Sequence, residues 1–273
     1  MRYGIDYVDK SYCLTGNKDY RLSIQVSLNG FSFCIYDAGK QKYVVLKNFP
    51  YSENILDFNI WTKEINRIAE NMAGYIHTEH PVKCLFFSRK NVLIPENIFS
   101  VNNIRPYISF FFQLDELDEI HYKYIPELEA YCCFALPSPV VSKIISRFGK
   151  SNFFNQAYQI IHRTKNFGTG MNVVFCGNFM DISIFKDSKL ILNNSFEIFD
   201  IKDIIYFIAA LSDKFGMGDA PVYISGDIST NEIRNLKKFF PSIVQEQNRK
   251  ISVLLGSEVS TKYYNLLSLQ ECE

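Results

Sequence analysis

The segment Val174–Phe185 has residue types and a spacing that could hold the phosphate groups of a nucleotide. In its sequence, VFCGNFMDISIF, Gly177 and Asn178 form a turn between two apolar runs, and Asp181 follows shortly after the turn. A glycine allows backbone N–H groups to approach phosphate oxygens, and a carboxylate can hold Mg²⁺ through water. The chemistry that this pattern would support is binding of a magnesium–nucleotide, so the elements that position the segment decide how it is interpreted.

The segment belongs to a predicted antiparallel meander. Three strand-like runs, at residues 171–176, 179–185 and 189–196, are separated by two short polar turns. The recurring isoleucines of residues 200–215 predict an amphipathic helix, and residues 222–225 predict a short buried strand after it.

The same order of elements occurs earlier in the chain. Residues 22–49 predict another three-stranded meander, residues 60–75 a helix, and residues 83–87 a short buried strand. When the two copies are aligned, Leu22 matches Met171 and Phe31 matches Met180. The second turn differs in length by two residues, and after it Phe49 matches Phe196. The sequence therefore predicts an α/β fold with an internal duplication, in which two βββαβα lobes have mixed sheets flanked by helices.

Between the two copies, the pattern is less regular. We predict a helix near residues 103–111, a solvated acidic turn at 115–119, a hairpin-like pair of strands at 120–125 and 128–136, and helices at 140–148 and 155–164. The sequence KNFGTG at residues 165–170 is typical of a linker. We expect a first lobe at residues 1–137, and linking helices with a second lobe at residues 138–273.

Composition narrows the classes of function. The chain has 273 residues, 47% of them hydrophobic, and 29 basic side chains balance 29 acidic ones. Zero net charge makes nucleic acid an unfavourable partner, and the longest apolar run, Ile204–Leu211, is far too short to span a membrane. The seven cysteines form no CxxC pair, and five of them lie in strand-like apolar runs. We expect a cytoplasmic protein with reduced thiols.

The doubled βββαβα unit resembles the actin-like fold, in which each half is similar to ribonuclease H. Actin-like ATPases, including pilus-assembly and cell-division homologues, carry a hairpin of the type D-x-G-G-G-T-T-D-I-A-I-F, and Val174–Phe185 is similar to it. The following KDSKL, Lys186–Leu190, resembles the turn KDGKL of the same proteins, and residues 128–148 resemble the pilus homologue. Over its whole length the chain resembles a bacterial family catalogued as domain of unknown function 3822, which looks like a reduced pilus-type actin homologue.

The resemblance implies where a nucleotide would bind. Gly226 matches the first glycine of the family's adenosine motif, although Asp227 replaces the next residue. A nucleotide-binding cleft would use the turn residues of both copies and the end of the fourth strand of the second copy, namely Asn29, Gly30, Gly177, Asn178, Asp181, Gly226 and Asp227.

Several of the groups that the family uses are replaced in this chain. The acid expected at the end of each first strand falls on Gln25 and Val174, and the glycine that follows falls on Ser27 and Cys176. The two threonines fall on Phe179 and Met180, whose bulk we expect where the phosphates would approach. We therefore predict no catalytic residue and no resident metal, with ATP and Mg²⁺ as possible but unfavoured ligands.

The residues argue against a nuclease and a zinc site, whereas the family resemblance implies a further role. A ribonuclease H-type nuclease needs an acid on the first strand, where Gln25 and Val174 stand. His77, His80 and Cys84 do not have the spacing of a standard zinc site. The family resemblance also implies a role as an accessory protein associated with rRNA modification, because genes of this family often lie beside an rRNA methyltransferase gene.

We therefore expect a non-catalytic actin-like-fold protein that works as a binding, adaptor or scaffold module for another protein or a peptide. The alternatives left open are a divergent ATP-binding protein that uses the cleft between its lobes, and the accessory protein associated with rRNA modification. The sequence leaves the oligomeric state and the identity of the partner open.

Overall fold

The computed structural model describes residues 5–13, 19–27, 30–51, 82–164 and 168–271, together with Asn66 and Glu70. The chain divides into two compact units. The first unit consists of Met1–Tyr158 and the C-terminal segment Leu269–Glu271, and the second consists of Gln159–Ser268.

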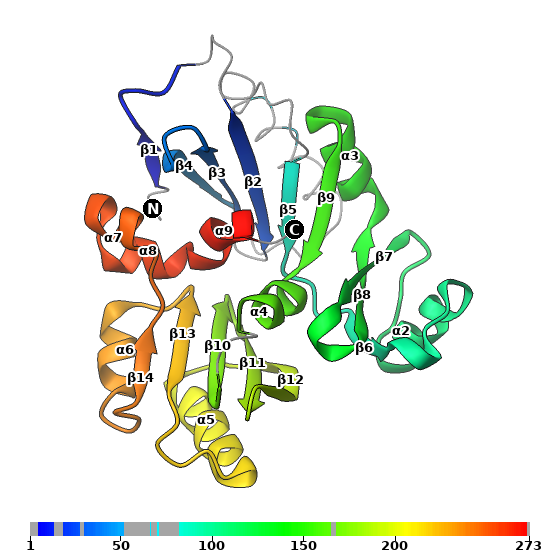
Figure 1. Ribbon diagram of the computed structural model, residues 1–273, viewed down its shortest axis with the longest axis vertical. Helices are drawn as coiled ribbons and strands as arrows, with labels where there is room; N and C mark the ends of the chain where they lie inside the picture. Colours follow the sequence, from blue (N-terminus) through cyan, green and yellow to red (C-terminus); the bar gives the residue numbers. More distant parts are fainter. Residues whose placement is uncertain are drawn as a thin grey trace. The chain divides into compact units, whose positions relative to one another are not determined.

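The main sheet of the first unit contains the first predicted meander. Its strand order is β1-β4-β3-β2-β5-β9 (Figure 1). Strands β2, β3 and β4 are antiparallel, whereas β5 and β9 run parallel to β2. The bounds are β1 Asp6–Val8, β2 Tyr20–Ser27, β3 Gly30–Asp37, β4 Lys42–Pro50, β5 Val82–Phe86 and β9 Ser151–Asn155.

The second unit repeats this arrangement. Its strand order is β12-β11-β10-β13-β14, with an antiparallel meander β10–β12 and with β13 and β14 parallel to β10 (Figure 1). The strands are β10 Gly170–Cys176, β11 Phe179–Lys186, β12 Lys189–Glu197, β13 Val222–Gly226 and β14 Ile243–Gln245. The helices are α4 Gln156–Thr164, which begins in the first unit, α5 Ile201–Phe215, α6 Thr230–Leu236, α7 Arg249–Leu255, α8 Ser257–Lys262 and α9 Tyr264–Ser268.

The strand registers confirm the duplication residue by residue. Leu22 pairs with Ile35 in the first copy, and the aligned Met171 pairs with Ile184 in the second. A β-bulge follows at the same place in both copies, between Ile35 and Tyr36 and between Ile184 and Phe185. Because a shift of one residue would turn every side chain to the opposite face of the sheet, matching registers mean that both copies keep the same buried face.

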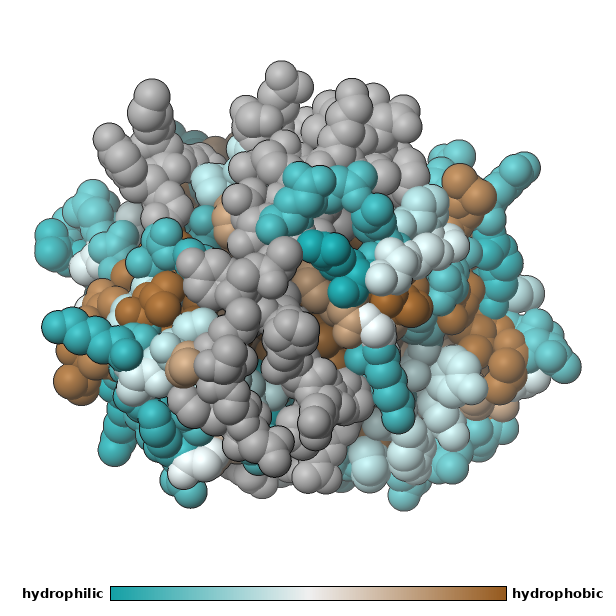
Figure 2. Space-filling model, turned by 90° about the horizontal axis from the view of Figure 1, so that it is seen from above, coloured by the Kyte–Doolittle hydropathy of each residue, from teal (hydrophilic) through white to brown (hydrophobic). Residues whose placement is uncertain are grey.

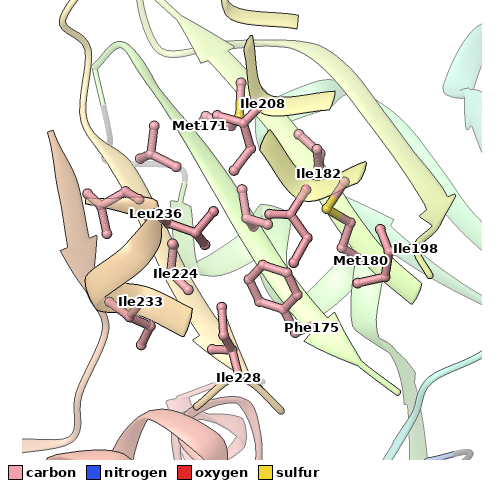
Figure 3. Close-up of a cluster of buried hydrophobic side chains, with 14 of the residues drawn as sticks. Met171, Phe175, Met180, Ile182, Ile198, Ile208, Ile224, Ile228, Ile233 and Leu236 are labelled. Carbon is pink, nitrogen blue, oxygen red and sulfur yellow. The ribbon is translucent and has the colours of Figure 1, made fainter. Parts of the chain in front are cut away.

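One face of the second sheet carries the hydrophobic core of its unit (Figure 3). Met171, Val173 and Phe175 alternate along β10 toward this face, and α5 and α6 cover it with residues such as Ile208 and Leu236. Both helices begin with a capping box, formed by Asp200 with Asp203 for α5 and by Ser229 with Glu232 for α6. The alternation of apolar side chains and the two caps thus explain the helix-on-sheet packing.

A smaller sheet is inserted between β5 and β9 of the first unit. Its order is β6-β8-β7, and α2 packs on it through Ile104 and Ile108. The elements of this insertion are β6 Asn91–Pro95, the 3-10 helices Glu96–Ile98, Val101–Asn103 and Pro126–Leu128, α2 Ile104–Phe111, β7 Asp118–Ile125, β8 Ala130–Pro137 and α3 Ser138–Phe148. A last 3-10 helix, Leu269–Glu271, belongs to the first unit, where Gln270 donates to Ser23 Oγ of β2 (2.5 Å).

The acidic segment at residues 115–119 differs from the solvated turn that we expected. Asp118 is buried, and it accepts hydrogen bonds from Lys90 Nζ (2.7 Å) and from the Asp115 amide (2.9 Å). Arg105 donates to the carbonyl oxygens of Asp115 and Asp118 (2.8 and 2.9 Å). The expectation is wrong for Asp118 because these donors satisfy a buried carboxylate and fix the turn before β7.

The predicted cysteine environment is confirmed for the described residues. Cys34, Cys84, Cys132, Cys133 and Cys176 are buried and Cys13 is exposed, and none of these six described cysteines forms a disulfide. Burial raises the pKa of the Cys133 thiol to about 12, so these side chains behave as small apolar groups.

The predicted helix at residues 60–75 lies outside the described residues, apart from Asn66 and Glu70, which are helical. His77 and His80 also lie outside them.

Within the described part of the chain, no helix is long and apolar enough to cross a membrane. On the face shown in Figure 2, the described residues form hydrophobic areas interspersed with hydrophilic side chains.

Candidate functional site

The ends of β10 and β13 bring together most of the predicted site residues of the second copy. Phe175 pairs with Gly226 in parallel register, and the Asp227 amide donates to the Phe175 carbonyl oxygen (2.9 Å). The turn Gly177-Asn178 follows β10 directly and Asp227 follows β13, so these residues lie at the same edge of the sheet. This edge is the candidate functional site of the second unit.

The two glycines at this edge are required by the backbone. Gly177 has φ +64°, whereas Asn178 does not have a positive φ, as in a two-residue type II′ hairpin turn with glycine first. Gly226 has φ +96°, and a Cβ atom there would lie 2.2 Å from the Phe175 carbonyl oxygen. The hairpin turn and the close packing of β13 on β10 account for both glycines without a ligand.

The residue at the expected acid position is an apolar one, and it is fully buried. Val174 lies on the sheet face opposite the hydrophobic core, between Asp181 on β11 and Ser225 on β13. Directly opposite residues of neighbouring strands share a face, so an acid at this position would stand beside the Asp181 carboxylate. Valine therefore removes a fixed negative charge from the end of the first strand.

The two remaining carboxylates of the candidate site are engaged by neighbouring side chains. Asp181 is buried and accepts a hydrogen bond from Ser195 Oγ of β12. Asp227 is exposed, and its Oδ1 forms an ion pair with Lys262 Nζ of α8 (2.7 Å). Asp181 is thus part of the β11–β12 ladder, and Asp227 connects the end of β13 to α8.

One expectation for this site is wrong. Met180 was expected to place bulk where phosphates would approach, but its side chain is fully buried in the hydrophobic core beside Ile182 and Ile198 (Figure 3). Phe179 pairs with Cys176 at the start of β11 and is partly exposed. The strand alternation beginning at Phe179 turns Met180 to the α5 face.

The first copy contributes fewer described residues. Asn29 lies outside the described residues, and Gly30 begins β3, where its carbonyl oxygen accepts from Ser27 Oγ (3.1 Å). A Cβ atom on Gly30 would lie 2.7 Å from the Phe49 carbonyl oxygen. Gln25, at the acid position, is half-buried, and among the described residues its Oε1 atom has no hydrogen-bond partner. This position is also uncharged.

A buried polar cluster on the same sheet face as Val174 was not predicted from the sequence. Arg163 of α4 forms an ion pair with Glu246, a residue that follows β14, with an N–O distance of 2.7 Å. Arg163 also donates a hydrogen bond to Asn265 Oδ1 of α9 (2.8 Å). Asn172 of β10 donates to Glu246 (3.1 Å), and Asn265 donates to Ser225 of β13 (3.5 Å). The polar cluster joins the second sheet to α4 and α9. A polar asparagine in the apolar run MNVVFC was the one signal available in the sequence.

The duplicated sheets, each with a meander followed by two parallel strands, define an actin-like ATPase fold. A protein of Bacteroides thetaiotaomicron VPI-5482 with this fold and unknown function has a TM-score of 0.77 at 19% identity, over 94% of this chain and 97% of that one. The chain belongs to the family described as "Protein of unknown function (DUF3822)", which matches residues 9–243.

Two further solved structures have the same fold at lower similarity. A chain of the PilM–PilN type IV pilus biogenesis complex has a TM-score of 0.62 at 9% identity, over 91% of this chain and 97% of that one. The ethanolamine utilization protein EutJ from Carboxydothermus hydrogenoformans has a TM-score of 0.50 at 9% identity, over 94% and 90%. No curated protein matches the chain. At these identities the solved structures establish the fold alone.

Proposed function

We propose that this protein is a non-catalytic member of the actin-like fold that works as a binding or adaptor module for another protein or a peptide. The observation that carries this proposal is the buried Val174 at the acid position of the second copy. Phosphoryl transfer depends on positioned charge and on Mg²⁺ bridging the phosphate oxygens. Gln25 makes the equivalent position of the first copy uncharged as well.

The other family-like features of the site have structural explanations, which supports the same proposal. Gly177 serves a hairpin turn, and Gly226 avoids a clash with the Phe175 backbone. The carboxylates of Asp181 and Asp227 interact with Ser195 and Lys262. Each of these four groups therefore has a role in holding the second unit together.

The proposed partner class follows from fold and charge. The PilM–PilN complex is an example of this fold in a protein complex, although at 9% identity the likeness is of the fold. The balance of 29 basic and 29 acidic side chains gives no broad electrostatic attraction for nucleic acid. We place the protein in the cytoplasm, where its buried thiols would stay reduced.

The experiment that tests the adaptor role is reconstitution with a purified partner. Cross-linking in cells identifies the candidate, and calorimetry with the purified pair then measures its affinity with and without Mg-ATP. We expect an affinity that does not change with nucleotide, because binding does not pass through a nucleotide-loaded state. A complex that forms only with Mg-ATP would contradict the proposal, and binding to rRNA in place of a protein would favour the accessory role.

A further inference from the structure

The two copies differ at the outer edge of their third strands. In the first copy, β1 covers β4 in antiparallel pairing, with Asp6 opposite Lys47 and Val8 opposite Val45. The alignment that places Phe49 on Phe196 places Val45–Lys47 on Leu192–Asn194 of β12. Among the residues that the structure describes, no strand pairs with this edge of β12 (Figure 1). The fold thus accepts an antiparallel strand at a position that is open in the second copy.

The open edge is protected at only one end. A bulge at Ile191 interrupts the ladder with β11, and Lys189 precedes it; both are features that discourage further pairing. From Leu192 to Glu197 the ladder with β11 is regular, without proline. Within this stretch the Ser195 amide donates to Asn194 Oδ1 (3.0 Å), a local bond of the kind that satisfies an amide on an unpaired edge.

The regular stretch of β12 is complementary to itself. If a second β12 pairs with it antiparallel around Asn194, each Leu192 lies opposite a Phe196, and each Asn193 lies opposite a Ser195. The apolar pairs fall on the face covered by α5, and the polar pairs fall on the face of Asp181. With the axis at Asn194, Glu197 lies opposite Ile191, two residues from Lys189, so antiparallel pairing brings unlike charges to the same end of the strand pair.

Apolar surface on α5 continues this edge beyond the strand. Phe196 of β12 stacks on Phe207 of α5 (ring centroids 4.6 Å), and Phe207 contacts Tyr206 (5.3 Å). Tyr206 is 66% exposed. A strand pair alone buries little surface, whereas stable interfaces bury roughly 800 Å² on each partner. This aromatic strip supplies the additional area beside the strand and on the same side of the sheet as α5.

We propose that the open edge of β12 is a dimerisation surface, on which a second copy of this chain pairs through its own β12. The two sheets become one continuous antiparallel sheet, with Asn194 of both copies at the two-fold axis and the α5 helices meeting on one face. β1 does not fill this role, because it already pairs with β4 in its own chain. Such a self-complementary contact is the usual form of a two-fold interface.

Sedimentation of the full chain over a range of concentrations tests the proposal. The wild type is expected to form a dimer. Asn194→Lys and Asn194→Asp each place two like charges directly opposite at the axis, and each is expected to weaken the dimer by about 10-fold or more. The control is Asn231→Lys, which makes the same change at an exposed position on α6 and is expected to leave the dimer unchanged.

An equimolar mixture of the two Asn194 variants gives the decisive result. The introduced lysine of one copy then lies opposite the introduced aspartate of the other, so the mixture is expected to recover the association that neither variant shows alone. Circular dichroism verifies that both variants are folded. A wild type that remains monomeric at every concentration would overturn the proposal. So would a dimer that neither substitution weakens, or a mixture that stays dissociated.

Discussion

Loss of the Arg163 guanidinium should destabilise the second unit more than any other single change to a charged side chain described above. The side chains of Arg163 and Glu246 are only 7% and 5% exposed, and their ion pair has an N–O distance of 2.7 Å. Arg163 also lies over the Tyr264 ring, 4.6 Å from its centroid. In Arg163→Met, the Glu246 carboxylate stays buried but loses its ion-pair partner. Among the described residues, Asn172 is then the side chain that still donates a hydrogen bond to it.

The magnitude follows from the cost of leaving a buried charge unpaired. Removal of one partner from a buried ion pair typically costs about 3–5 kcal/mol, and several neighbouring hydrogen bonds here depend on the same guanidinium. For a unit of this size the expected fall in melting temperature is roughly 10–20 °C. Replacing both partners leaves no unpaired charge. The loss in free energy of unfolding for the double variant Arg163→Met/Glu246→Met should therefore be smaller than the sum of the losses for the two single variants, by about 2 kcal/mol or more.

Urea titration followed by far-ultraviolet circular dichroism measures these free energies of unfolding. Arg249→Met is the matched control, because Arg249 is exposed at the start of α7, and it should change stability by less than about 0.5 kcal/mol. The reasoning is refuted if Arg163→Met costs less than about 1 kcal/mol. It is also refuted if the double variant equals the sum of the single variants, because the two side chains would then act independently.

Three further predictions concern other parts of the molecule. Gly226→Ala should lower the melting temperature, since it forces a Cβ against the Phe175 backbone at φ +96°, whereas Gly168→Ala, with no atom within 4 Å, should be nearly neutral. Burial lowers the pKa of His121 in the folded chain, so the unfolded chain binds more protons just below neutral pH. The stability of the protein should therefore fall as the pH drops through about 6.5, and melting curves of His121→Phe across this pH range should show a weaker dependence. Titration with a thiol reagent should find all seven cysteines in the denatured chain without reductant, whereas the five buried ones should react slowly in the native protein; a shortfall of two would reveal a disulfide.

The sequence predicted the duplicated meanders well because period-two alternation over seven to nine residues determines which face of a strand is buried. The aligned positions Leu22 and Met171 therefore have the same register in the structure. Four strands, β1, β6, β9 and β14, were not predicted. They have three to five residues each, and β9, SNFFN, has polar ends, so their pairing depends on neighbouring strands rather than on local pattern.

The candidate site was predictable only in part. Turn chemistry indicated the hairpin turn at Gly177, and the family resemblance indicated Gly226; the structure places both glycines at one edge of the sheet, each with a positive φ. The position of Met180 in the core was missed because a motif alignment does not state which face a side chain takes. The ion pair of Arg163 and Glu246 joins residues 83 positions apart, and no local spacing indicates such a contact.

The central claim, that an actin-like fold persists here without nucleotide chemistry, is tested most directly with Mg-ATP and the purified full chain. Phosphate release and calorimetric binding are measured for the wild type and for Asp181→Asn combined with Asp227→Asn. We expect no phosphate release above the buffer rate and no heat of binding for the wild type, because Gln25 and Val174 leave the acid position of each first strand without a carboxylate. Turnover by the wild type that the double variant abolishes would contradict the account and would identify those aspartates as the metal-binding acids.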